Sequence, residues 1–294
     1  MTWWFSPMPA ERLAMLRILI GSYALVYVVA RMPELAAIAQ LPAAQFAPVG
    51  VVRVIAQPLA PVVVLAIAIA TVAALVSFVA GFRYRILAPL AAAGLLWTLS
   101  YRSSWGMVFH TDNLVVLHLI ALACAPAADA WGVGRRRPVP PREAGHGWAI
   151  KLLAALTCAT YVVAGIAKLR LAGLDWLDGD QLRNQIAIDN VRKALLGGTT
   201  APLAALLVGH RAALAALSIA TLAIELGAPF ALLGGRVARV WALAAWLFHA
   251  GVIAAMYVWF PYPLSGVAFL PLIDAEHVVG WPVRCWRSRA ISVT

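Results

Sequence analysis

Charged residues are scarce in this sequence, and acidic ones are the scarcest. Only 12% of its 294 residues are charged, with 12 Asp and Glu against 23 Lys and Arg, whereas 63% are hydrophobic. The mean hydropathy is +0.86. A soluble domain is about half apolar and about one quarter charged, so this composition excludes a soluble globular protein.

Cysteine is also nearly absent. The three cysteines, Cys124, Cys158 and Cys285, show no CxxC spacing, and two of them lie inside apolar runs. We therefore expect buried thiols, with neither a disulfide framework nor a metal site.

The shortage of acidic residues leaves a formal charge of +11 and a pI near 10.3. The basic residues lie at the ends of apolar runs and form no patch interleaved with aromatic residues, which argues against nucleic acid as a partner. In a membrane protein such residues report orientation and contact with anionic membrane lipids.

Long apolar runs are what the sequence does have. A hydrocarbon core needs about 20 apolar helical residues per span. The runs predict an all-α, polytopic integral membrane helical bundle of about 7–8 transmembrane helices. The eighth run is the weakest, because it carries Asp274, Glu276 and His277. The expected spans are residues 13–30, 61–82, 86–101, 110–127, 148–168, 212–233, 237–257 and 264–283.

The segments between these runs complete a predicted single domain over residues 1–294, without a soluble C-terminal domain. Proline-rich residues 32–60 and the charged region of about residues 170–200 suit interfacial helices, the second on the outward side. Residues 129–147 read as a polar cytoplasmic loop. Its Arg135–Arg137 cluster favours a cytoplasmic N-terminus in an inner membrane. The side of the C-terminus depends on whether residues 264–283 span.

Ionisable side chains at membrane depth are functional candidates, because each costs several kcal/mol unless it is paired or hydrated. Four stand out: His110, Lys168, Glu225 and His249. His110 lies in SYRSSWGMVFHTDN, which is unusually rich in hydrogen-bonding groups. The predicted topology places His110, Lys168 and His249 on the outward side, where a lysine can act as general base and a histidine can stabilise an oxyanion.

Each candidate also has a structural interpretation. Lys168 can extend its ammonium to the membrane interface. Glu225 can pair with an interior cation such as Arg17, or with backbone groups near Pro229. His249 alone is more often a hydrogen-bonded packing residue, and His118 carries that interpretation more strongly.

Four blocks of sequence carry a resemblance to a known family. They are RSSWGMVFHTDNLVVLHLIALACAPAADAW, YVVAGIAKLRLAGLDWLDGDQLR, ELGAPF and WLFHAGVIAAMYVWFPY. In this order they resemble segments of the horizontally transferred transmembrane (HTTM) domain family, which is related to the membrane part of vitamin K-dependent γ-glutamyl carboxylase. The likeness runs from about Glu11 to Trp281.

The resemblance implies roles for single residues. Lys168, in an AG-x-x-KL stretch followed by DW-x-x-G, takes the position of a base linked to oxidation of a reduced quinone of the menaquinone or vitamin K type. His110 and His249 take the positions of functional histidines, and Glu225 that of an acidic residue. The substrate-binding set predicted from these blocks is Trp105, Asp112, Asn113, Asp175, Trp176 and Glu225.

Two hypotheses of different class remain open. The first is a quinol-linked membrane enzyme, carboxylase-like or epoxidase-like, with Lys168 as base. Peptide γ-carboxylation itself is not expected, because the carboxylase's large lumenal domain has no counterpart before Thr294. The second is a non-catalytic membrane protein that binds a lipid or a partner protein, with the polar cluster structural. Transport is less favoured, since no internal repeat is found.

Overall fold

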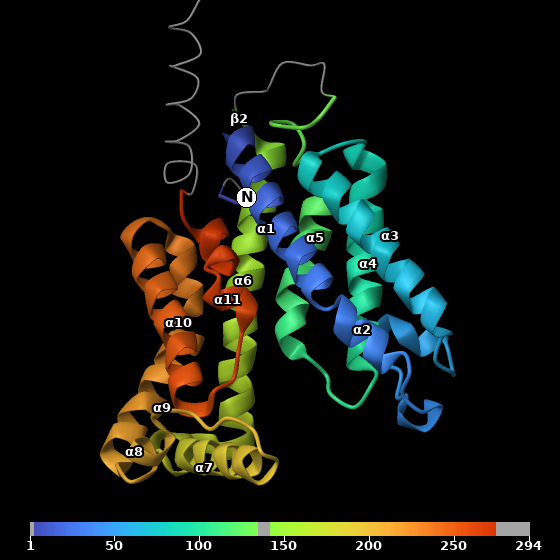
Figure 1. Ribbon diagram of the computed structural model, residues 1–294. Coiled ribbons are helices and arrows are strands. Elements are labelled where there is room, and N and C mark those ends of the chain that lie inside the picture. Colours follow the sequence, from blue (N-terminus) through green and yellow to red (C-terminus); the bar gives the residue numbers. More distant parts are fainter. Residues whose placement is uncertain (1–2, 135–141, 275–294) are drawn as a thin grey trace, which may run out of the picture. The chain divides into compact units, whose positions relative to one another are not determined.

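A computed structural model describes residues 3–134 and 142–274 of the chain (Figure 1). Of His110 and Arg142 it describes the backbone alone. The regular secondary structure of these residues is helical except for one short antiparallel pairing of two strands. These residues form two compact units. Unit 1 comprises Met1–Leu153 with Asp274–Thr294, and unit 2 comprises Ala154–Ile273.

Four helices in the described ranges are long and apolar enough to cross a membrane. They are α1 (Ala10–Ala30), α3 (Pro61–Ala80), the stretch Ala144–Asp178 that contains α6 (Ala144–Ala172), and α10 (Gly235–Met256). These match four of the predicted spans, and the chain is a multi-pass membrane protein. The predicted number of about 7–8 spans is wrong.

The other three clear runs fall short for separate reasons. Helix α5 (Asn113–Ala123) has 11 residues and reaches only about 17 Å. Helix α9 (Arg211–Leu226) has 16 residues, because the α-helix ends at Gly227 before Pro229. Helix α4 (Tyr84–Ser103) is 20 residues long, but Arg85 and Arg102 lower its hydropathy.

The weak eighth run is not one continuous helix in its described part. The chain forms α11 (Pro261–Leu264) and then the 3-10 helix η6 (Val267–Leu272), separated by Gly266 at φ 77°. Prolines at 263 and 271 withhold the N–H groups that a continuous helix needs. Glu276, His277 and Cys285 lie outside the described residues.

Regular structure extends into residues 129–147, predicted as a loop, and into residues 32–60, predicted to hold an interfacial helix. In residues 129–147, β2 (Arg142–Glu143) pairs with β1 (Met8–Pro9), and α6 begins at Ala144. The Arg135–Arg137 cluster lies outside the described residues. Residues 32–60 contain α2 (Met32–Ile38) and the 3-10 helices η1 (Ala43–Gln45) and η2 (Gly50–Val54). Of the described cysteines, Cys158 is buried as predicted, whereas Cys124 is exposed.

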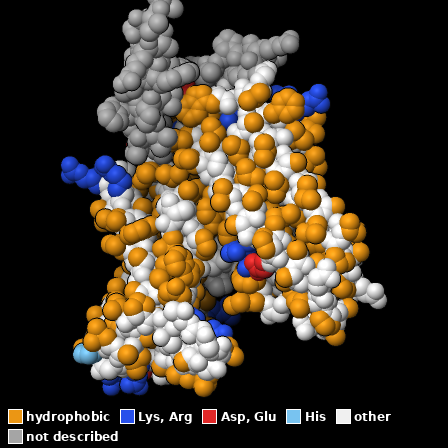
Figure 2. All heavy atoms as spheres, in the orientation of Figure 1, with side chains coloured by type: hydrophobic (Ala, Val, Ile, Leu, Met, Phe, Trp, Pro, Cys, Tyr) orange, Lys and Arg blue, Asp and Glu red, His pale blue; other side chains and the backbone are white. Residues whose placement is uncertain are grey.

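In unit 1, helix α3 packs against α1 and α4, and α5 packs against both of those helices as well (Figure 1). Leu13, Leu75 and Leu95 are fully buried between them. The close contact of α1 with α3 requires Gly21, where an added Cβ would lie 2.8 Å from the Phe78 ring. The outer faces are apolar too: Val62, Ile69 and Val76 of α3 are exposed two turns apart, as expected of a lipid-facing helix. Hydrophobic side chains dominate the face shown in Figure 2.

Arg17 is the largest fully buried side chain of unit 1. Its guanidinium donates to the carbonyls of Ala127 (3.1 Å), Ala130 (3.5 Å) and Trp131 (2.9 Å). Among the described residues no carboxylate forms an ion pair with Arg17. The positive charge of Arg17 is therefore stabilised by backbone carbonyl groups that follow the end of α5.

In unit 2, helix α7 (Asp180–Leu195) runs across the ends of α9 and α10, beside α8 (Ala204–Val208) (Figure 1). Asn190 joins these helices. Its amide donates to the carbonyls of Ile186 (2.8 Å) and Ala255 (3.1 Å), and its oxygen accepts from the N–H of Ala201 (2.7 Å). One buried side chain thus satisfies three backbone groups.

We expect Asn190→Leu to lower the free energy of unfolding by about 2 kcal/mol, because buried backbone groups lose their partners. Thermal unfolding in detergent measures the change. Asn184→Leu is the matched control, since Asn184 is exposed on the same helix. Equal melting temperatures for the two variants would contradict the assigned role.

Asp189 of α7 predicts a pH dependence of stability. Burial acts to raise the pKa of Asp189, but hydrogen bonds and charges from Lys193 (2.6 Å) and Arg192 (2.8 Å) outweigh it and leave that pKa below its ordinary value. The stabilisation is therefore present above the unfolded-state pKa and is lost as the pH falls through the lower folded-state pKa. Between about pH 5 and pH 3, wild type should lose more stability than Asp189→Asn, as measured by melting temperature against pH.

Candidate functional site

The first polar centre is an ion pair in unit 2. Lys168 Nζ of α6 lies 2.5 Å from Glu225 Oε1 of α9, and the side chains are 23% and 3% exposed. The two helices come close because residue 165 is glycine: an added Cβ there would lie 3.1 Å from Glu225 Cβ. The ammonium also lies 5.4 Å from the centre of the buried Trp176 ring, which follows in the 3-10 helix η4 (Gly173–Asp178).

A second hydrogen bond in unit 2 joins α6 to α10. Tyr161 Oη lies 2.8 Å from His249 Nε2, and both side chains are buried. Aromatic rings surround them: Trp241 stands edge-on to Tyr161 at 5.0 Å, and Phe260 lies 4.9 Å from His249. His249 is thus held in one orientation by Tyr161, which the sequence did not single out.

These two hydrogen bonds can hold and move protons. A lysine–carboxylate pair shares one transferable proton, and a phenol–imidazole pair another. Within these two pairs, Glu225 Oε2 and His249 Nδ1 are buried and have no hydrogen-bond partner among the described residues. Because a buried polar atom without a partner is costly, both are positions where a bound hydroxyl group or water would be stabilised.

The other polar centre belongs to unit 1 and is built around Asp112, at the end of the 3-10 helix η3 (His110–Asp112). Asp112 accepts from Tyr27 Oη (2.6 Å) and from Arg102 Nη1 (3.0 Å). Arg102 Nε donates to Glu34 (2.6 Å), and its guanidinium lies 3.4 Å from the centre of the Phe109 ring. We call Tyr27, Glu34, Arg102 and Asp112 the Asp112 network.

Sequence reasoning found Asp112 but missed Arg102 and Tyr27. Arg102 is an ionisable residue at the end of an apolar run, so the criterion of cost at membrane depth would have selected it. Tyr27 gives no such signal, because a tyrosine in an apolar run is ordinary. Asn113 begins α5 and is exposed, and Asp175 is exposed in η4. Trp105 packs against Phe46 at 5.2 Å.

Glu225 and His118 both make the buried contacts that their structural interpretations predict. Glu225 pairs with Lys168, whereas the alternative partner, Arg17, bonds to carbonyls. His118 is fully buried against the Leu153 carbonyl at 3.1 Å, in agreement with its structural interpretation. The predicted topology places His110 and Lys168 on the same outward side. His110 belongs to unit 1 and Lys168 to unit 2, so a site that they share stays a prediction.

Comparison with known proteins gives one match. Residues 5–272 match the family model described as HTTM domain. No curated protein and no solved structure matches the chain.

Proposed function

The chain belongs to the HTTM domain family, and from this premise we propose that it is a membrane enzyme that binds and oxidises a reduced quinone, with Lys168 as general base. The observation that carries the proposal is the Lys168–Glu225 ion pair, in which Glu225 is buried and Lys168 is half-buried. A charged pair inside an apolar bundle is costly to desolvate, and packed apolar residues are often at least as stable in its place. The presence of such a pair therefore favours a use beyond stability.

The step assigned to Lys168 is a proton transfer. The short hydrogen bond lets the ammonium proton move to Glu225, which leaves a neutral amine beside a neutral acid. The amine then takes the proton of a quinol hydroxyl: the O–H bond breaks, an N–H bond forms, and a quinolate anion remains. Molecular oxygen then takes two electrons from this anion, together with the proton of its second hydroxyl group and the proton held by the lysine, which leaves the quinone and hydrogen peroxide.

Other residues would assist that step. Trp176, whose buried ring centre lies 5.4 Å from the lysine ammonium, would hold the base in position for a bound quinol. His249 and Tyr161 would relay the released proton, since they form the second proton-carrying pair of unit 2. His110 is proposed to stabilise the quinolate oxygen. The chemistry takes place on the outward face of an inner membrane, in accord with the predicted orientation.

The test is menaquinol oxidation by the purified full chain in lipid nanodiscs, followed by absorbance. The double variant Lys168→Gln with Glu225→Gln removes the base without leaving one charge unpaired. It should oxidise menaquinol at least about 100-fold more slowly than wild type, with a nearly unchanged melting temperature. Arg170→Gln is the matched control, because Arg170 is exposed two residues further along α6. Unchanged turnover in the double variant would reject Lys168 as the base.

A second candidate is a non-catalytic protein that binds a lipid or a partner. It is favoured by the Asp112 network, in which Arg102 bonds two carboxylates and Tyr27 bonds one of them, as in a structural cluster. In that case wild type should show no menaquinol oxidation at all, while Arg102→Leu still lowers the melting temperature. Turnover by wild type decides between the two.

A further inference from the structure

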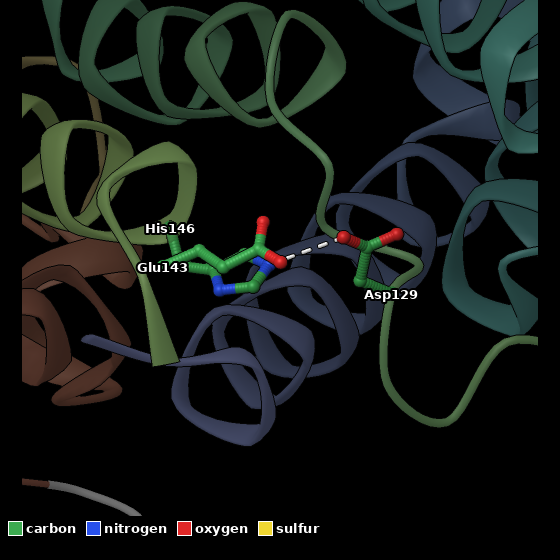
Figure 3. Close-up of side chains that lie close together, drawn as sticks. All are labelled: Asp129, Glu143 and His146. Atoms are coloured by element: carbon green, nitrogen blue, oxygen red, sulfur yellow. Dashed lines mark hydrogen bonds and ion pairs between the residues drawn. The ribbon is translucent and has the colours of Figure 1, made fainter. Parts of the chain in front are cut away.

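Three side chains from separate segments of unit 1 converge at the start of α6 (Figure 3). Asp129 lies in the turn after α5, Glu143 in β2, and His146 in the first turn of α6. Each side chain offers one ligand atom, a ring nitrogen or a carboxylate oxygen, and these atoms lie within 4.8 Å of one another. Figure 3 shows both carboxylates directed toward the imidazole.

The local sequence explains this arrangement. The pairing of Met8 with Glu143 fixes the backbone immediately before α6. Glu143 is the last residue of β2 and His146 lies in the first turn of α6, so only two residues separate them along the chain. Asp129 completes the cluster, with its Oδ2 atom 3.1 Å from His146 Nε2.

The imidazole is held rigidly. His146 is fully buried, and its Nδ1 atom has no hydrogen-bond partner among the described residues. Its Nε2 atom faces the carboxylates and contacts Asp129. The neighbouring Gly147 lies so close to the N-terminal segment that an added Cβ would meet the Ser6 carbonyl at 2.0 Å. The ring is therefore preorganised before any ligand arrives.

The carboxylates, by contrast, are accessible. The Asp129 side chain is 38% exposed, and Glu143 is exposed. The Glu143 carboxylate forms no hydrogen bond or ion pair with the residues that the structure describes, so it can rotate toward a bound ion at little cost. An ion can reach the cluster from solvent and retain water at its remaining positions.

We propose that Asp129, Glu143 and His146 bind a divalent transition-metal ion of the Zn²⁺ or Mn²⁺ class. Bonds of about 2.0–2.2 Å to nitrogen and oxygen set neighbouring tetrahedral ligands about 3.3 Å apart. The 3.1 Å between Asp129 and His146 is already close to that spacing. Ca²⁺ and Mg²⁺ are disfavoured, because they prefer oxygen ligands alone.

This site is independent of the proposed quinol chemistry. The expectation of no metal rested on the cysteines, which take no part here. The bound ion would replace the proton between His146 and Asp129. It would link the turn after α5 to β2 and α6. Binding that occurs only in the folded state stabilises it.

The experiment uses the full chain without an affinity tag, in detergent, after removal of metal by a chelator. Titration with Zn²⁺, followed by calorimetry and by metal analysis after dialysis, should give one ion per chain. Glu143→Gln and Asp129→Asn should each weaken binding at least about 10-fold. Glu11→Gln, an acidic residue of unit 1 outside the cluster, and His210→Gln, an exposed imidazole, are the matched controls and should bind as wild type does.

A second measurement guards against a folding defect. Zn²⁺ should raise the melting temperature of wild type, and this rise should be absent in Glu143→Gln even though that variant melts normally without metal. Binding equal in all variants, or no saturable binding to wild type, would overturn the proposal and leave the His146–Asp129 contact as a structural hydrogen bond.

Discussion

Lys168→Ala should lower the free energy of unfolding by about 3–5 kcal/mol, because it leaves the Glu225 carboxylate buried without a cation. That carboxylate is only 3% exposed, and its second oxygen already has no partner in the described part of the chain. The loss corresponds to a fall in melting temperature on the order of 10 °C. Thermal unfolding in detergent measures it.

The double variant separates this penalty from any catalytic role. Replacing both residues by Gln removes the pair as a unit, so most of the stability lost in Lys168→Ala should return. If the single and double variants are equally unstable, the pair is not coupled as the geometry indicates. Menaquinol oxidation by the double variant is measured separately. If its stability returns but it does not oxidise menaquinol, Lys168 has a catalytic role as well as a structural one.

Gly179→Ala should be nearly as damaging, at about 3–5 kcal/mol. Gly179 adopts φ +85°, which a side chain strains, and an added Cβ would lie 2.5 Å from the backbone nitrogen of Ala215. Backbone cannot move aside as a flexible side chain does, so the strain and the clash add. This glycine is the last residue of the DW-x-x-G motif, and the close approach of η4 to α9 explains the motif in physical terms.

Gly173→Ala is the control for this second prediction. Gly173 also has a positive φ of +60°, but no atom lies within 4 Å of its added Cβ. Its replacement should cost only the backbone strain, about 1 kcal/mol. Equal melting temperatures for the two alanine variants would show that the contact with α9 is not tight.

Membrane class and family were predictable because they depend on composition and on blocks of sequence. The number of spans was not, because an apolar run does not reveal where its helix ends. Residues 110–127 read as one span, yet His110–Asp112 form a 3-10 helix, and only Asn113–Ala123 continue as α-helix. Residues 212–233 likewise contain Gly227 and Pro229, whose effect on helix length depends on their neighbours.

The candidate site shows the same limit. Ionisable residues were selected from the sequence because each is energetically costly at membrane depth. Lys168 and Glu225 were therefore identified one by one and not as a pair. Their pairing depends on how α6 and α9 face each other, which no local pattern encodes. Tyr161 was missed because a tyrosine in an apolar run is ordinary, and only the hydrogen bond to His249 distinguishes it.

The burial of Arg17 has a consequence for biosynthesis. Its guanidinium belongs to α1, which is translated well before its hydrogen-bond acceptors, the carbonyls of Ala127, Ala130 and Trp131. Until those residues have been translated, the nascent helix carries a cation without its final acceptors, and a charge in lipid is costly. Assembly of the amino-terminal bundle is therefore completed late, once more than a hundred further residues have been made.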